Sequence, residues 1–189
     1  MKCETAILQR RSELNSFIEL LKRENVQSYL EIGSKFGGSL WAIGNSLPKG
    51  SKIVAVDLPH GDTSFKQSEA PLRECVEQLR KLGYQTSLIL GDSTERSVID
   101  DVYALGPFDA VFIDANHTLP YVKADWENYG KIGKLIAFHD ISFFRAKGLP
   151  PHKKPIEVPI FWNEIKKQHR YLEIKHDPND NGIGVLWPT

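Results

Sequence analysis

The sequence has little of several features that would restrict the class of protein. Only two of its 189 residues are cysteines, Cys3 and Cys75. They form no CxxC pair or cysteine–histidine zinc motif, so we expect two reduced, buried thiols in a reducing compartment. No apolar run reaches about 18 residues, which excludes a predicted membrane-spanning helix. The 24 basic residues balance the 24 acidic ones, so the composition carries no electrostatic sign of nucleic-acid binding.

The first residues lack the apolar run of a signal peptide, and we therefore expect a cytoplasmic protein. A chain of this length suits a single domain with a full hydrophobic core. Hydrophobic residues make up 41% of the sequence and charged residues 25%, which excludes a disordered chain and a membrane-embedded one. We predict one folded domain over residues 1–189.

What the sequence does contain is a repeated alternation of short apolar runs with amphipathic segments. The apolar runs predict strands over residues 26–32, 53–56, 86–90, 108–113 and 135–138. The amphipathic segments predict helices over 5–23, 40–47, 72–82, 95–104 and 119–131. Continuously apolar strands are typical of parallel sheets that are buried on both faces. The order strand–loop–helix therefore predicts a doubly wound, Rossmann-like α/β fold.

The first of these helices dominates an N-terminal segment over residues 1–24. Leu14, Phe17 and Ile18 recur at helical spacing and predict the side of the helix that faces the core. Charged residues, Glu13 among them, lie between these apolar positions and make the helix amphipathic.

The last third of the chain departs from the alternation. Residues 141–158 are rich in proline, lysine and histidine, and we interpret them as a surface loop or lid. A helix over 160–168 follows. Runs over 171–175 and 183–187 predict a strand pair around a turn. With this pair the sheet becomes seven-stranded, mostly parallel, with helices on both faces and an antiparallel C-terminal strand.

Nearly every predicted strand ends in an acid or a glycine. In open parallel sheets, ligands bind beyond the carboxyl ends of the strands, near the point where the strand order reverses. Acids gathered at one edge would repel one another unless ligands, a metal or hydrogen-bond donors offset them. The residues in question are Glu31, Gly33, Asp57, Asp92, Ser93, Asp114, His139 and Asp140.

The loop after the first strand reads EIGSKFGGS, residues 31–39. Glycines there allow tight turns and a close approach of the backbone to a ligand. Lys35 occupies the second glycine position of a GxGxxG motif, so the loop suits a dinucleotide poorly. Asp57 could accept hydrogen bonds from a ribose diol or form a turn. Asp92 could accept from an adenine amino group or cap the next helix.

Five segments carry a more specific likeness: YLEIGSKFGGSL, VAVDLP, LGDS, FDAVFIDANHTLPYVKADWENY and GKLIAFHDI. Taken in this order, the chain resembles the class I S-adenosylmethionine-dependent methyltransferases. It is most similar to the group of cephalosporin hydroxylase-like and macrolide or sugar O-methyltransferases. The resemblance implies that the methionine part of S-adenosylmethionine lies against Glu31, Gly33, Ser34, Gly37 and Ser39. It also implies a ribose at Asp57, an adenine beside Asp92 and Ser93, and a sulfonium beside Asp114.

Metal-dependent relatives bind a divalent cation at positions that correspond to Asp114, His139 and Asp140. The resemblance thus implies a site for Mg²⁺ or Mn²⁺. His139 replaces the acid that many relatives carry, which favours manganese, iron or zinc, or no metal at all. Either His117 or His139 could then serve as the general base, with Asp114 beside the reacting groups. Alternatively, His117 could bond Asp125 and fix the loop.

The resemblance therefore predicts O-methylation of a small hydroxylated acceptor, such as a sugar or a natural product. Two alternatives stay open: methyl transfer to nitrogen, and binding of S-adenosylmethionine without turnover. We expect neither a nucleic-acid nor a membrane partner, and the N-terminal helix could form a homodimer interface.

Overall fold

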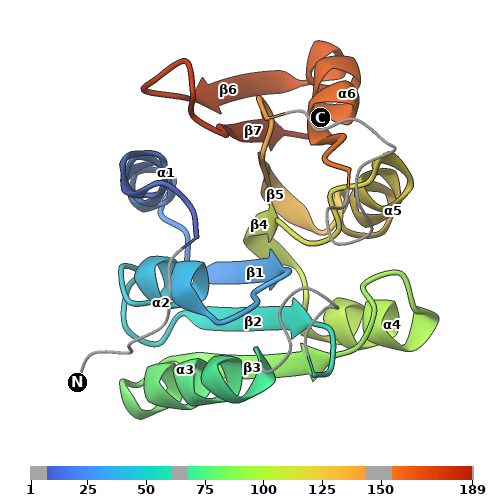
Figure 1. The fold of residues 1–189 in the computed structure, drawn as a ribbon. Coiled ribbons are helices and arrows are strands. Elements are labelled where there is room, and N and C mark those ends of the chain that lie inside the picture. The colour runs from blue at the N-terminus through green and yellow to red at the C-terminus, as the bar shows by residue number, and fades with distance from the viewer. Residues whose placement is uncertain (1–7, 61–67, 144–154, 189) are drawn as a thin grey trace.

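The computed structural model describes residues 8–60, 68–143 and 155–188, and Figure 1 shows their arrangement. The strands are β1 (Ser28–Ile32), β2 (Lys52–Asp57), β3 (Gln85–Leu90), β4 (Phe108–Ile113), β5 (Gly133–His139), β6 (Arg170–Ile174) and β7 (Ile183–Trp187). The helices are α1 (Arg11–Arg23), α2 (Gly38–Gly44), α3 (Glu69–Lys81), α4 (Arg96–Leu105), α5 (Leu119–Tyr129) and α6 (Val158–Ile165), and a 3₁₀ turn follows at Lys166–Gln168.

All seven strands form one sheet in the order β3-β2-β1-β4-β5-β7-β6. The pairs from β3 to β5 are parallel, whereas β7 is antiparallel to both β5 and β6. The chain moves outward in one direction from β1 to β3 and then in the other from β4, so the order reverses between β1 and β4. These observations confirm the predicted doubly wound, mostly parallel sheet.

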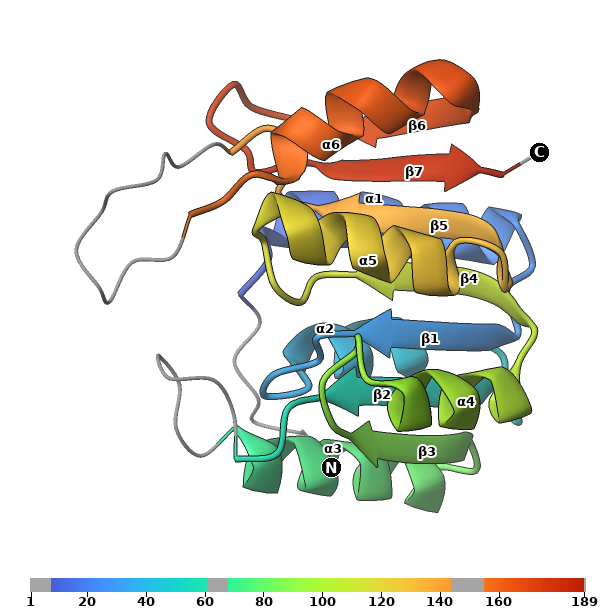
Figure 2. The ribbon, with the colours of Figure 1, turned by 90° about the vertical axis from the view of Figure 1, so that its right-hand side faces the viewer.

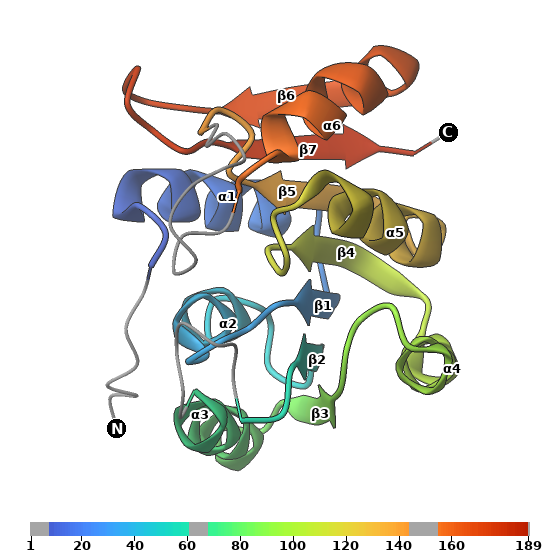
Figure 3. The same ribbon diagram turned by 45° about the vertical axis from the view of Figure 1, so that its right-hand side comes forward.

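Helices cover both faces of the sheet, with α1, α2 and α3 on one side and α4, α5 and α6 on the other (Figure 3). Successive strand side chains point to opposite faces. In β1, Tyr29 packs in the cluster under α1–α3 and Leu30 in the cluster under α4–α6. Burying each large apolar side chain contributes about 1.5–3 kcal/mol, which explains why both faces of the strands are apolar.

Several boundaries differ from the sequence prediction. Helix α1 begins at Arg11, because residues 8–10 are not helical and residues 1–7 lie outside the described part. Glu13, one of the charged residues of the amphipathic segment, is fully buried. Helix α6 begins at Val158, inside the predicted 141–158 loop. Residues 144–154 of that loop, with Arg145, Lys147, His152, Lys153 and Lys154, lie outside the described residues, as does Cys3.

Cys75 is buried, and its thiol donates to the Gly37 carbonyl at 3.2 Å. Over the described ranges, none of the helices has the length and apolar character that a membrane crossing requires.

Candidate active site

A cavity of about 870 Å³ opens at the carboxyl edge of the parallel strands, beside the point between β1 and β4 where the strand order reverses. Figure 2 shows the strand ends and the loops that follow them at this edge. The lining includes most of the residues expected there: Gly33, Ser34, Ser39, Asp57, Asp92, Ser93, Asp114, His117, His139 and Asp140. Glu31 and Gly37 do not line it, because Glu31 is buried in the core and Gly37 lies at the start of α2.

The loop after β1 depends on Gly33. Its φ is +89°, and a Cβ atom there would lie 2.4 Å from the Asp114 carbonyl oxygen and 2.5 Å from the Ala115 Cα. Only glycine avoids both problems. The loop is also tied to β2, because the backbone N–H of Lys35 donates to the Asp57 carboxylate. The first two loops at the sheet edge are thus held together.

Glu31 supports this loop from the core. It is fully buried and accepts hydrogen bonds from the Tyr29 hydroxyl at 2.6 Å and the Ser39 hydroxyl at 2.8 Å. Burial raises the pKa of Glu31 to about 7, although both hydroxyls act to lower it. Ser34 is also buried, and its hydroxyl makes no hydrogen bond of good geometry within the described residues, but it lies close enough to Glu31 to act with the other two hydroxyls in lowering the pKa of that carboxyl. Ser34 lines the cavity.

The loop after β3 is braced by α5. Asp92 accepts from the backbone and the hydroxyl of Thr94 at 2.9 and 2.7 Å, and α4 takes Glu95 as its N-cap residue. Asp92 therefore stabilises a turn and is not the helix cap. The Ser93 hydroxyl donates to Asp125 at 2.6 Å.

Burial raises the pKa of Asp125 to about 7, with Ser93 opposing this change and Asp92 adding to it. The structure pairs Asp125 with Ser93 and pairs His117 with Asp114. The alternative in which His117 bonds Asp125 is therefore not the arrangement found.

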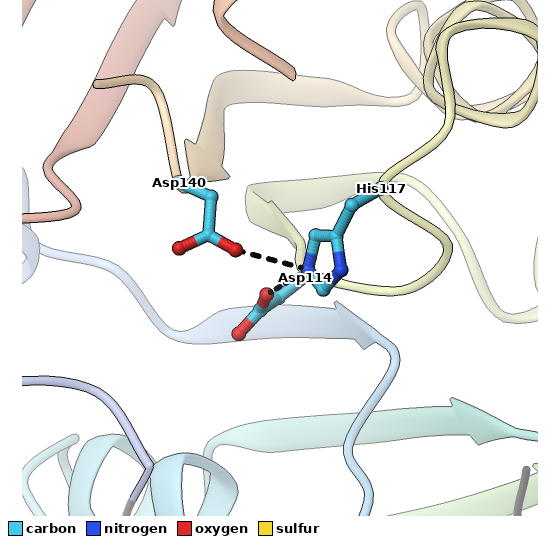
Figure 4. Close-up of side chains that lie close together, drawn as sticks. All are labelled: Asp114, His117 and Asp140. Carbon is cyan, nitrogen blue, oxygen red and sulfur yellow. Dashed lines mark hydrogen bonds and ion pairs between the residues drawn. The ribbon is translucent and has the colours of Figure 1, made fainter. Parts of the chain in front are cut away.

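Asp114, His117 and Asp140 converge on one wall of the cavity (Figure 4). The Nε2 atom of His117 lies 3.1 Å from Asp114 Oδ1 and 3.4 Å from Asp140 Oδ2. The loop that carries His117 is held because Glu157 donates its backbone N–H to the His117 carbonyl at 2.7 Å. Asp140 has a φ of +61°. Such backbone strain in a non-glycine residue is typical of functional sites.

His139 lies behind this cluster, with its side chain only 7% exposed. Its Nδ1 atom is 3.4 Å from Asp114 Oδ1 and 3.3 Å from Asp140 Oδ1. Burial acts to lower the pKa of His139, but Asp114, Glu13 and Asp140 raise it well above its usual value. Burial acts to raise the pKa of Asp114, yet His139 and His117 hold it well below its usual range.

Three residues that the sequence did not reveal complete the site. Gln9 donates to Asp114 Oδ2 and Asn181 donates to Asp140 Oδ1, both at 2.6 Å. Glu13 lies on the far side of His139. Gln9 and Glu13 come from the N-terminal segment and Asn181 from the β6–β7 turn. The spacing of Glu13, four residues before Phe17 and seven before Leu20, is a local sign of the core side of α1, whereas no local pattern distinguishes Gln9 and Asn181 from surface polar residues.

The donor chemistry of the cluster fits a divalent cation. One ligand atom from each of Asp114, His117 and Asp140 lies within 4.8 Å of the others. Two carboxylates and one imidazole suit manganese, iron or zinc better than magnesium, which prefers oxygen ligands. The family resemblance implied His139 in this set. The structure brings His139 to the same carboxylates but also turns its Nε2 atom toward Glu13.

A family model described as a methyltransferase domain matches residues 30–141, more than half of the chain. The chain belongs to this methyltransferase family. A caffeoyl-CoA O-methyltransferase from Stellaria longipes is 25% identical over 181 residues, which cover 87% of this chain and 69% of that protein.

Solved structures of O-methyltransferases share the fold of this methyltransferase. One from Bacillus cereus, in complex with SAH, aligns with a TM-score of 0.67 and 15% identity, covering 98% of this chain and 84% of that one. Another, from Streptomyces achromogenes and involved in tomaymycin synthesis, is in complex with SAM. It aligns with a TM-score of 0.66 and 16% identity, covering 98% of this chain and 82% of that one. The prediction of a class I S-adenosylmethionine-dependent methyltransferase is confirmed. The finer likeness to sugar and macrolide enzymes stays a prediction.

Proposed function

We propose that this methyltransferase transfers a methyl group from S-adenosylmethionine to a hydroxyl oxygen of a small acceptor. The observation that carries the proposal is one cavity with two differently built walls. One wall has the glycine loop, Asp57 and Asp92, and the other has the Asp114–His117–Asp140 cluster. A methyl donor and a hydroxyl acceptor need such a pair of walls because their reacting atoms must be held in line and away from water.

The first wall offers groups that match the donor. The turn at Gly33 and Ser34, which both line the cavity, would hold the methionine part. Asp57 would accept from the ribose diol, and Asp92 with the Ser93 backbone would adjoin the adenine. S-adenosylmethionine supplies an activated methyl group when bound, so the protein needs to position and desolvate more than to activate.

The second wall would receive the acceptor. Leu8, Tyr121 and Ile156 give this side of the cavity apolar surface, which suits a small organic molecule with few charges. Asp114, His117 and Asp140 would hold a divalent cation, which when bound would lower the pKa of an acceptor hydroxyl. His117 points its Nε2 atom at both carboxylates. Without a metal, Nε2–H would stay donated to the carboxylates and the opposite ring nitrogen, Nδ1, would take the acceptor proton, so that the carboxylates stabilise the resulting imidazolium.

The first experiment is calorimetry with SAH, followed by detection of SAH formed from S-adenosylmethionine with a panel of hydroxylated acceptors that includes caffeoyl-CoA, catechols and sugars. Each acceptor is tested after chelation and after addition of Mn²⁺. We expect SAH to bind and at least one hydroxyl acceptor to be methylated. Binding without turnover on the whole panel would point to a binding protein instead, and absence of SAH binding would refute the proposal.

Variants then locate the chemistry. Asp114→Ala and His117→Ala should each lower kcat by roughly 10²–10⁴-fold, the range for groups that take part in proton transfer. Asp100→Ala is the matched control, because Asp100 is an exposed aspartate on α4 that pairs with Arg96 at 2.9 Å. Equal activity of the His117 variant and the control would exclude His117 from the reaction.

A further inference from the structure

Glu13 is a buried acid that the proposed chemistry does not use. It is fully buried on the core side of α1 and lies outside the 30–141 region that matches the family. One carboxylate oxygen, Oε1, accepts the backbone N–H of Gly182 at 2.5 Å. The other, Oε2, has no hydrogen-bond partner among the described residues. A buried carboxylate is costly unless a cation or donors compensate it, so the position calls for an explanation.

The imidazole of His139 faces it. The Nε2 atom of His139 lies 3.9 Å from Glu13 Oε2 and has no hydrogen-bond partner in the described part of the chain. The opposite ring nitrogen, Nδ1, faces Asp114 and Asp140 at 3.4 and 3.3 Å. The imidazole therefore lies between one carboxylate on α1 and two on the cavity wall. Figure 3 shows α1 lying along the sheet beside β5, the strand that ends at His139.

We propose that Glu13 is a positioning residue that acts through His139. Its carboxylate fixes the orientation of the imidazole, so that the Nδ1–H group keeps the Asp114 and Asp140 carboxylates where they meet His117. A ring turned over would present carbon atoms in place of its nitrogens to these acids and would leave them without that donor. Second partners of this kind orient reacting groups and commonly change function by about tenfold to a hundredfold when removed.

The competing explanation is purely structural. Glu13 also joins α1 to the β6–β7 turn through Gly182, and other contacts make the same connection. The Ser16 hydroxyl lies 2.9 Å from His176 Nε2, and Arg10 lies 3.3 Å from Asp180. If the only role of Glu13 were to attach this turn, then removing one of these contacts would have the same effect as removing the carboxylate charge.

The test compares Glu13→Gln with Ser16→Ala in the full-length protein. Glutamine keeps the size of the side chain and an oxygen for the Gly182 N–H, but it removes the negative charge that faces His139. Ser16→Ala removes one contact between α1 and the turn without touching His139. The ring-nitrogen NMR signals of His139, assigned by their loss in His139→Asn, report its orientation, and the SAH dissociation constant, kcat and KM report function.

We expect Glu13→Gln to shift both ring-nitrogen signals of His139 and to lower kcat by about tenfold or more, with the SAH dissociation constant within about twofold of wild type. Ser16→Ala should change neither. Unchanged His139 signals in Glu13→Gln, or a kcat no lower than that of Ser16→Ala, would overturn the proposal. The inference rests on the proposed methyl transfer. If the wild type turns over no acceptor, that function fails, while the NMR comparison still decides whether Glu13 orients His139.

Discussion

Replacing Gly33 with alanine tests whether the glycine loop shapes the cavity as described. At a φ of +89°, a residue with a Cβ atom is disfavoured by about 1–2 kcal/mol. The added carbon would also lie 2.4 Å from the Asp114 carbonyl oxygen and 2.7 Å from the Ala115 nitrogen. These are backbone atoms that cannot rotate away, and overpacking of this kind costs about 1–3 kcal/mol. The two effects together predict a loss of about 2–5 kcal/mol in the free energy of unfolding.

The same clash predicts a functional loss. Relief of the contact requires the segment at Asp114 and Ala115 to move away from β1, and Asp114 is the residue around which the cluster is built. Urea denaturation measures the stability loss, and calorimetry with SAH measures binding. We expect Gly33→Ala to bind SAH at least tenfold more weakly than wild type.

Gly50→Ala is the matched control. Gly50 has a φ of +85°, but a Cβ atom there meets nothing within 4 Å. This variant should lose only the conformational contribution, about 1–2 kcal/mol, and bind SAH as the wild type does. If Gly33→Ala matched Gly50→Ala in both measurements, then the close approach of β1 and the Asp114 segment would not control the site.

Three further substitutions examine the rest of the site. Burial raises the pKa of Asp125 to about 7, so the folded state favours its neutral form. The free energy of unfolding therefore falls as pH rises from about 4 to about 7, by at most about 1.4 kcal/mol for each pH unit. Asp125→Asn should reduce this slope between about pH 5 and about pH 7 in urea titrations, and an unchanged slope would contradict it. Asp57→Asn should weaken SAH binding about tenfold in calorimetry, since the carboxylate is proposed to accept from the ribose diol; an equal affinity would remove Asp57 from that role. Glu31→Ala leaves the Tyr29 and Ser39 hydroxyls without their acceptor and should lower the free energy of unfolding by about 1–3 kcal/mol. Glu31→Gln keeps an acceptor oxygen and should lose less. Equal stabilities of the two variants would argue against a contribution from the buried hydrogen bonds.

Much of the fold follows from local patterns in the sequence. The run over 108–113 matches β4 at both ends, because a strand buried on both faces needs unbroken apolar residues. The turn at Gly33 needs glycine, and this too is visible locally. Since parallel strands place their carboxyl ends at one edge, Asp57, Asp92 and Asp114 were expected to gather there, and all three line the cavity.

The roles of individual polar side chains were not determined in this way. Glu13 carries the charge of a surface residue, yet it is buried on the core side of α1, where the backbone N–H of Gly182, 169 residues away, compensates its carboxylate. Gln9 reaches Asp114 across 105 residues, and Asn181 reaches Asp140 across 41.

The sequence by itself determined which segments are strands and helices and at which edge of the sheet a ligand would bind. Hydrophobic periodicity and glycine conformation act within a few residues of the chain and are therefore readable along it. Only the tertiary structure decided which nitrogen of His139 meets which acid, and that Glu13, Gln9 and Asn181 belong to the site. Hydrogen bonds and charge pairs depend on distances of a few ångströms between groups that folding alone brings together.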